Sequence, residues 1–209
     1  MANPRSKQES NVYSFLKRHY LPIVIAFAVT FIGLFGSDVT LWLRYDRNAI
    51  LSGEIWRIFT GHLAHLTWSH LLMNLLGLAL VWGLFDRNMP AKRWLHTTLF
   101  SGFGISLLLM VVDPHLRWYV GLSGVLHGMF IVGCLYDMKA GRWDSKLLMA
   151  MIIAKLLWEQ LVGPLPGSET TAGGSVVVDA HLFGALMGFI TYLVFRRADN
   201  RSVVAPQHS

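Results

Sequence analysis

Cysteine is nearly absent from this chain of 209 residues, which contains only Cys134. A single cysteine excludes a disulfide framework within the chain and a zinc site built on cysteines. Charge is also scarce, because Asp, Glu, Lys and Arg make up 14% of the residues, against about a quarter in soluble domains. There is no repeat of fixed period and no low-complexity linker. With 54% apolar residues, the composition favours a membrane protein over a soluble domain.

Long apolar segments are what the sequence does contain. Several approach the roughly 20 residues that a helix needs to cross a bilayer, so we expect an all-α, polytopic bundle of six transmembrane helices. The first segment lies too deep in the chain, and lacks the small-residue cleavage site, for a signal peptide. We expect one membrane domain over residues 20–196, with tails at 1–19 and 197–209. The segments are Tyr20–Phe35, Leu66–Phe85, Trp94–Val112, Tyr119–Tyr136, Leu147–Val162 and Val176–Phe195.

Basic residues are unevenly divided among the loops, and 13 of the 18 fall on one side of the expected bundle. Lysine and arginine collect on the cytoplasmic side of membrane proteins, so both termini are predicted to be cytoplasmic. The loops at Gly36–His65, Asp113–Trp118 and Gly163–Ser175 should then face outward. The net charge of +6 is scattered between apolar segments, which argues against nucleic acid as a partner and for the lipid bilayer.

Polar side chains inside three of these segments are candidates for function, because such groups are costly in a membrane. His70 and Asn74 share one helical face and can donate hydrogen bonds toward one point. Ser123, in GLSGVLHG, has glycines around it that let another backbone approach its oxygen. His181 begins the sixth segment, and a histidine beside a serine can take its proton. Each residue alone could equally form a hydrogen bond between helices.

Three further polar residues leave alternatives open. Lys155 and Glu159 lie one turn apart in the fifth segment, and we favour mutual neutralisation over gating or proton handling. His127 lies four residues after Ser123 on the same face; it could be a competing base, a proton relay or a buried structural histidine, and we favour the last. No acidic partner for His181 is evident, so we expect a Ser–His dyad with no metal and no cofactor.

Four sequence patterns fall in order along the chain, and the ordered set resembles the rhomboid intramembrane serine proteases. Two of them carry glycines at four-residue spacing, which let helices approach closely. The patterns are a Trp-Arg pair, HxxxxHxxxN, GxSGxxxG and HxxGxxxG, present as Trp56-Arg57; His65, His70 and Asn74; Gly121, Ser123, Gly124 and Gly128; and His181, Gly184 and Gly188.

The resemblance implies that Ser123 is the nucleophile and His181 the general base. It further implies that His70, Asn74 and the Ser123 backbone stabilise the oxyanion, and that the first-loop pair and His65 are structural. A narrower resemblance is to the rhombosortase branch. That branch implies a multi-pass protein of a bacterial inner membrane, with its site open to the periplasm. Its expected substrates are single-pass membrane proteins with a C-terminal Gly-Gly motif and apolar helix.

Two other functions fit parts of the sequence. A rhomboid-like protein without activity could bind membrane helices, although such relatives usually lack the serine or the histidine. A haem or metal protein could use His62, His65 and His70, but this leaves Ser123 and the glycine patterns unexplained. Release of an acyl-enzyme by water or by an amine acceptor stays open.

Overall fold

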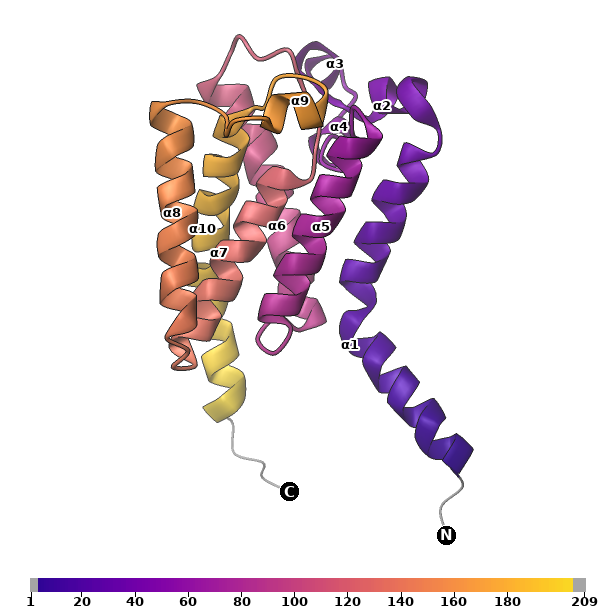
Figure 1. Ribbon diagram of the computed structural model, residues 1–209, viewed down its shortest axis with the longest axis vertical. Helices are drawn as coiled ribbons and strands as arrows, with labels where there is room; N and C mark the ends of the chain where they lie inside the picture. Colours follow the sequence, from indigo (N-terminus) through magenta and orange to yellow (C-terminus); the bar gives the residue numbers. More distant parts are fainter. Residues whose placement is uncertain (1–3, 205–209) are drawn as a thin grey trace.

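The computed structural model describes residues 4–204, with side chains described for residue 15 and residues 18–196, and this part of the chain is mostly helical. Long helices form a bundle, and the short elements gather at one end of it (Figure 1). The long helices are α1 (Pro4–Gly33), α5 (Trp68–Phe85), α6 (Ala91–Val112), α7 (Ser123–Lys139), α8 (Asp144–Leu161) and α10 (Val178–Val204). The short elements are α2 (Gly36–Leu43), β1 (Tyr45–Asp46), α3 (Arg47–Leu51), α4 (Arg57–Thr60), β2 (Trp118–Tyr119) and α9 (Ser168–Ala172).

Local signals explain where several elements begin or bend. Thr67 caps α5, because its hydroxyl accepts the His70 backbone N–H at 3.1 Å. Pro22 lies inside α1, where it removes a backbone hydrogen bond. Figure 1 shows that α1 is bent near its middle. Gly36, with φ of +72°, permits the 119° turn between α1 and α2.

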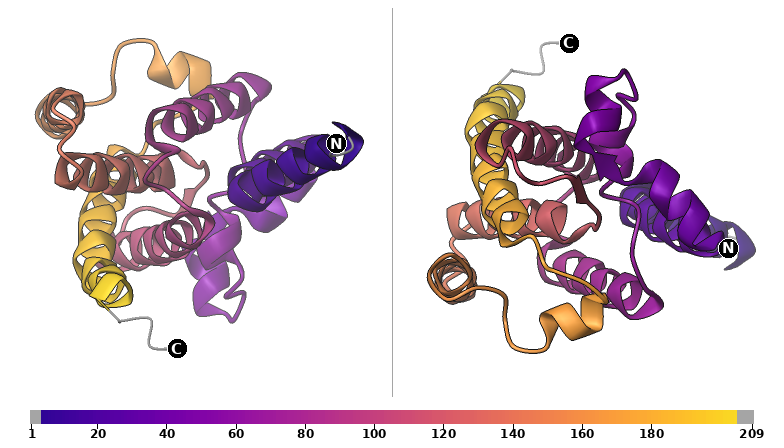
Figure 2. Two further views of the ribbon diagram at one scale, coloured as in Figure 1. Left: turned by 90° about the horizontal axis from the view of Figure 1, so that it is seen from below. Right: turned by 90° about the horizontal axis from the view of Figure 1, so that it is seen from above.

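Helix α7 is the centre of the bundle. It packs on α5, α6, α8 and α10, and most of its side chains are buried. Helix α1 instead packs on α5 and α6, and α8 packs on α7 and α10. Figure 2 shows α1 and α8 on opposite sides of the molecule. Helices α5 and α8 both pack on α7, and residues of all three line one cavity.

Three helices are long and apolar enough to cross a membrane: Trp68–Phe85, Ala91–Val112 and Val178–Arg196. The bent pair Arg18–Gly33 and Gly36–Leu43 makes a fourth if it is one span. The fourth and fifth predicted segments are helices but do not qualify by length and composition. Helix α7 has 17 residues, and α8 carries four charged residues within 18. The chain is therefore a multi-pass membrane protein with three to four clear candidate spans among its described residues.

Segment ends differ most from the sequence prediction at three places. The fourth segment was expected from Tyr119, but Trp118–Tyr119 pairs with Tyr45–Asp46 as a short antiparallel ribbon, and the helix starts only at Ser123. Helix α1 begins at Pro4 and α10 ends at Val204, so both helices continue into the segments expected as tails. Residues 1–3 and 205–209 of those tails lie outside the described residues. The first turn of α1 and the last turn of α10 lie at the same end of the molecule (Figure 1).

Candidate active site

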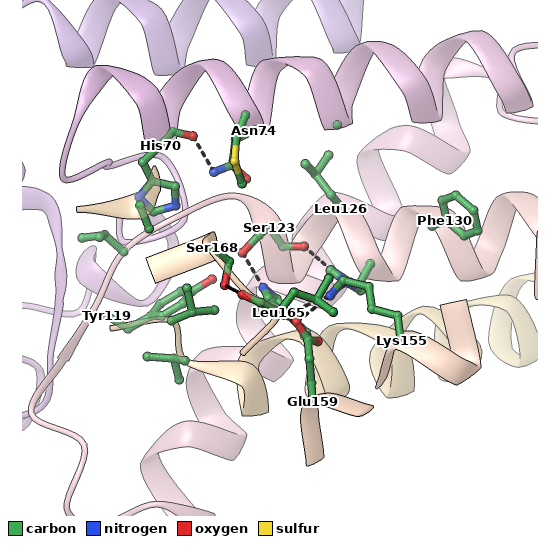
Figure 3. A pocket seen from close by; sticks show the side chains of 18 of the residues that line it. His70, Asn74, Tyr119, Ser123, Leu126, Phe130, Lys155, Glu159, Leu165 and Ser168 are labelled. Carbon is green, nitrogen blue, oxygen red and sulfur yellow. Dashed lines mark hydrogen bonds and ion pairs between the residues drawn. The ribbon is translucent and has the colours of Figure 1, made fainter. Parts of the chain in front are cut away.

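A cavity of about 360 Å³ lies between α5, α7 and α8, beneath the segment that joins α8 to α10. Polar groups and apolar side chains both line it, and Figure 3 shows Ser123 near the middle with Leu126 and Phe130 to one side. Ser123, His181, His70 and Asn74, all predicted from the sequence, line this one cavity. Three different helices supply the four residues, which lie far apart in the sequence. The apolar part is formed by Met73, Gly77, Leu80, Val81, Leu126, Phe130 and Ile152.

Ser123 and His181 are in hydrogen-bond contact. The Ser123 Oγ lies 2.9 Å from His181 Nε2, within the distance that general-base activation requires. Ser123 is the first residue of α7, so its backbone N–H has no acceptor within the helix. His181 lies in the first turn of α10 and is 6% exposed. The pair therefore lies at the start of two adjacent helices.

Glycines hold these two helices together. A Cβ at Gly124 would lie 2.7 Å from the Ala180 carbonyl oxygen, and one at Gly128 would lie 2.8 Å from the Gly184 carbonyl oxygen. From α10, Gly184 faces the Gly124 carbonyl and Gly188 faces the Gly128 carbonyl in the same way. The two GxxxG patterns thus meet each other, as the helix-packing interpretation of the sequence predicts. This backbone contact sets the separation of Ser123 and His181.

His70 and Asn74 face the cavity from α5 (Figure 3). The His70 ring lies against Gly121, where a Cβ would be 2.9 Å from Nε2, and Gly121 itself has φ of +121°. Glycine is required there both by the backbone and by the histidine. One Asn74 Nδ2–H donates to the His70 carbonyl oxygen at 3.0 Å, which leaves the second amide proton for a ligand in the cavity.

Glu159 is an acidic neighbour of His181 that the sequence interpretation missed. Its carboxylate oxygens lie 3.0 and 3.1 Å from His181 Nδ1. The ion pair expected within α8 is also present, with Lys155 Nζ 2.7 Å from Glu159 Oε1. Spacing of four residues revealed that pair, but only tertiary packing of α8 on α10 reveals the contact with His181. Asp179, two residues before His181 in the sequence, is not among the residues that contact the His181 imidazole.

His127 occupies the other side of Lys155. Its Nδ1–H donates to the Ser123 carbonyl oxygen at 2.7 Å, and its Nε2 accepts from Lys155 Nζ at 2.9 Å. The ring stacks on His181, with centroids 4.3 Å apart and planes at 16°. Both ring nitrogens are therefore engaged by groups other than the Ser123 hydroxyl. In the part of the chain that the structure describes, the group suited to a metal ion is His127, Glu159 and His181, and the Lys155 ammonium stands among their ligand atoms.

The segment before α5 supports the site from outside the cavity. Arg57 is buried and donates to the Leu41 and Arg44 carbonyl oxygens at 2.9 and 3.0 Å. Trp56, next to it, packs its ring 5.8 Å from that of Trp42. The Gly61 carbonyl oxygen accepts the Gly121 N–H at 3.0 Å. These contacts tie the Trp-Arg segment to the turn that precedes Ser123.

The histidines of this segment are buried in their neutral form. His65 Nδ1–H donates to the Leu63 carbonyl oxygen at 3.1 Å, and its ring lies 4.9 Å from that of His70. Burial lowers the pKa of His65 to about 3, with the nearby His70 as a second cause. Burial likewise lowers the pKa of His62 to about 4, although its Nε2–H donates to the Gly102 carbonyl oxygen at 2.8 Å. His62, His65 and His70 do not form a metal cluster in the described chain.

A short cap closes the cavity from above. Leu165, Ser168 and Ala172, in and before α9, line its roof. The cap is fastened to the start of α5, where the Ser69 hydroxyl donates to the Thr171 carbonyl oxygen at 2.6 Å. The cavity therefore lies beneath this cap.

Comparison with known families agrees with this arrangement. A model of the Rhomboid domain matches residues 52–198, a range that contains every residue of the site and more than half of the chain. Members of that family are generally intramembrane serine proteases, although some are inactive. The chain belongs to the rhomboid family.

Proposed function

We propose that this protein is an intramembrane serine endopeptidase in which Ser123 is the nucleophile and His181 the general base. The observation that carries the proposal is the 2.9 Å contact between Ser123 Oγ and His181 Nε2 at the wall of a cavity that both polar groups and apolar side chains line. An apolar cavity beside a paired serine and histidine suits a peptide drawn from a transmembrane segment.

The reaction follows from the two contacts of the imidazole. Ser123 Oγ attacks the scissile carbonyl carbon while its proton passes to His181 Nε2. The tetrahedral intermediate collapses when the C–N bond breaks, and the same proton moves from Nε2 to the leaving amine. Water then attacks the acyl-enzyme, gives its proton to Nε2, and releases the carboxylic acid and the Ser123 hydroxyl. An amine in place of water would instead yield a new amide.

Three hydrogen-bond donors near Ser123 would stabilise the developing oxyanion. The Ser123 N–H stands at the N-terminus of α7, where the helix dipole also favours negative charge. His70 and the remaining Asn74 amide proton come from α5. Loss of one such donor typically lowers the rate by about 10² to 10³.

We assign the protein six spans, both termini in the cytoplasm, and a site open to the periplasm of a bacterial inner membrane. The distribution of basic residues supports this orientation. The common end shared by α2, α4 and α9, opposite the first turn of α1, agrees with an even number of crossings (Figure 1). In this arrangement α7 and α8 cross within the bundle, because α7 is shielded by its neighbours and the Lys155–Glu159 pair faces the cavity.

We further propose single-pass membrane proteins with a C-terminal Gly-Gly motif and apolar helix as substrates, as in the rhombosortase branch. The resemblance of the motifs supports this, and physics gives a reason. A substrate helix must unwind locally before Ser123 can reach the scissile bond. Glycine lowers the stability of a helix by about 1 kcal/mol relative to alanine. Two glycines therefore lower the cost of exposing the bond.

Labelling with a fluorophosphonate probe separates this function from a rhomboid-fold protein that only binds helices. The intact protein in detergent should be labelled at Ser123, and Ser123→Ala and His181→Ala should lose labelling while keeping the thermal unfolding midpoint. A folded wild-type protein that is not labelled favours the binding protein. In cells, membrane proteins whose C-terminal ends lengthen in the Ser123→Ala strain would identify the substrates.

A further inference from the structure

Glu159 contacts the atom of His181 that faces away from the serine. Its side chain is 3% exposed, and both of its oxygens lie within 3.1 Å of His181 Nδ1. The opposite ring nitrogen, Nε2, faces Ser123 Oγ at 2.9 Å. The His181 imidazole thus lies between the Glu159 carboxylate and the Ser123 hydroxyl, and the three groups come from α10, α8 and α7.

The tautomer of His181 follows from these contacts. A carboxylate can only accept, so it requires the proton on Nδ1. The lone pair is then on Nε2, where it can take the Ser123 proton. Lys155 Nζ lies 3.5 Å from the same Nδ1, and an ammonium can only donate, so it favours the opposite tautomer, in which Nε2 carries the proton and cannot act as a base. Glu159 therefore favours the His181 tautomer whose Nε2 can act as a base, and Lys155 alone would favour the other.

Lys155 is held where it orients the carboxylate. Its ammonium lies 2.7 Å from Glu159 Oε1 and 2.9 Å from His127 Nε2. His127 is in turn fixed by its bond to the Ser123 carbonyl oxygen. Lysine and glutamate that merely neutralised each other would leave His181 with no acceptor at Nδ1. The double contact of the carboxylate with that atom goes beyond neutralisation.

We propose that Glu159 is a positioning residue that completes a Ser123–His181–Glu159 triad, with Lys155 and His127 fixing its carboxylate. The proposal rests on the protease function above. Glu159 keeps Nδ1 protonated in the resting enzyme and stabilises the imidazolium that forms when His181 takes the serine proton. It keeps its own negative charge throughout, and no proton passes to it.

Glu159→Gln tests this with almost no change of side-chain size. With Lys155 donating to the amide oxygen, the amide NH₂ faces Nδ1 and donates to it, which drives the proton to Nε2. We expect fluorophosphonate labelling of Ser123 to slow by at least about 100-fold, since the corresponding change in a soluble serine protease triad lowers kcat by about 10⁴. Asp179→Asn is the matched control, because it removes an acid near His181 that does not contact the imidazole, and it should label at the wild-type rate.

A direct measurement of the tautomer separates positioning from folding. In protein labelled with ¹⁵N-histidine, the His181 signals, assigned by their loss in His181→Ala, should show protonated Nδ1 in the wild type and protonated Nε2 in Glu159→Gln. If the single variant does not fold, Glu159→Leu with Lys155→Met is measured instead; it removes both charges and leaves Nδ1 with no acceptor, so labelling should again slow. Labelling within threefold of the wild type, or slow labelling with an unchanged tautomer, overturns the proposal. Failure of the wild type to label would overturn the protease function itself.

Discussion

Replacing Gly184 by alanine tests whether the backbone contact between α7 and α10 sets the geometry of the dyad. A Cβ there would lie 2.6 Å from the Gly124 carbonyl carbon, whereas ordinary contacts begin at 3.4 Å. The Gly124 carbonyl oxygen lies closer still, and both atoms are backbone, so the helices themselves have to separate by at least about 0.8 Å.

The separation acts directly on the 2.9 Å contact between Ser123 and His181, because Ser123 precedes Gly124 and His181 lies one turn before Gly184. A misplacement of about 1 Å in an active site can cost 10²-fold in rate, and overpacking costs about 1–3 kcal/mol of stability. We therefore expect Gly184→Ala to label with fluorophosphonate about 100-fold more slowly and to unfold at a lower temperature.

Gly83→Ala is the matched control, since a Cβ at this position of α5 meets nothing within 4 Å. It should keep the wild-type labelling rate and gain up to about 1 kcal/mol of stability, because alanine is the better helix former. Both variants are purified in the same detergent and compared by labelling time course and thermal unfolding. A Gly184→Ala protein that labels within threefold of Gly83→Ala would show that the glycine contact does not set the dyad.

Three further predictions concern the buried histidines and Lys155. His127→Ala should keep labelling within about tenfold of the wild type, because His127 holds Lys155 and the Ser123 carbonyl rather than the hydroxyl; loss as complete as in His181→Ala, at an unchanged unfolding midpoint, would make His127 a second base. Burial lowers the pKa of His62 from 6.5 to about 4, so the unfolded chain binds a proton there at a higher pH than the folded chain does, and stability is lost as pH falls from 6.5 toward 4. The unfolding midpoint of His62→Gln should therefore fall less over this range than that of the wild type. Equal slopes of midpoint against pH would show that His62 does not contribute to this loss of stability. Lys155→Ala removes the ammonium from among the ligand atoms of His127, Glu159 and His181, which lie within 4.8 Å of one another. Zn²⁺ should therefore raise the unfolding midpoint of this variant more than that of the wild type, and EDTA should reverse the change. Equal shifts of the midpoint in the two proteins would contradict this.

The sequence was informative where function depends on local spacing. His70 and Asn74, four residues apart, do share a face of one helix, and the glycines of GLSGVLHG do meet those that follow His181. Hydropathy located the six long helices to within a few residues at most ends. It misplaced the start of α7, because apolar character does not reveal that Trp118–Tyr119 pairs as a strand and that Gly121 adopts a positive φ.

Glu159 shows the limit of the same reasoning. Its nearest oppositely charged residue in the sequence is Lys155, and a pair at this spacing within one helix explains both charges without reference to any other segment. The contact with His181 joins residues 22 positions apart on two helices, and it depends on how α8 leans on α10. Helix packing of that kind has no signature in the order of residues.

Under the proposed mechanism, helix α8 would let the site select substrates by rate. It forms one wall of the cavity at Ile152, and its next two turns carry Lys155 and Glu159. Helices α7 and α10 meet backbone to backbone and have no room to yield, whereas α8 reaches them through side chains. A substrate segment that fits the cavity would leave the Glu159 carboxylate in contact with His181. Under the same mechanism, a segment that forced α8 outward would move Glu159 away from His181, so that segment would be bound but cleaved slowly.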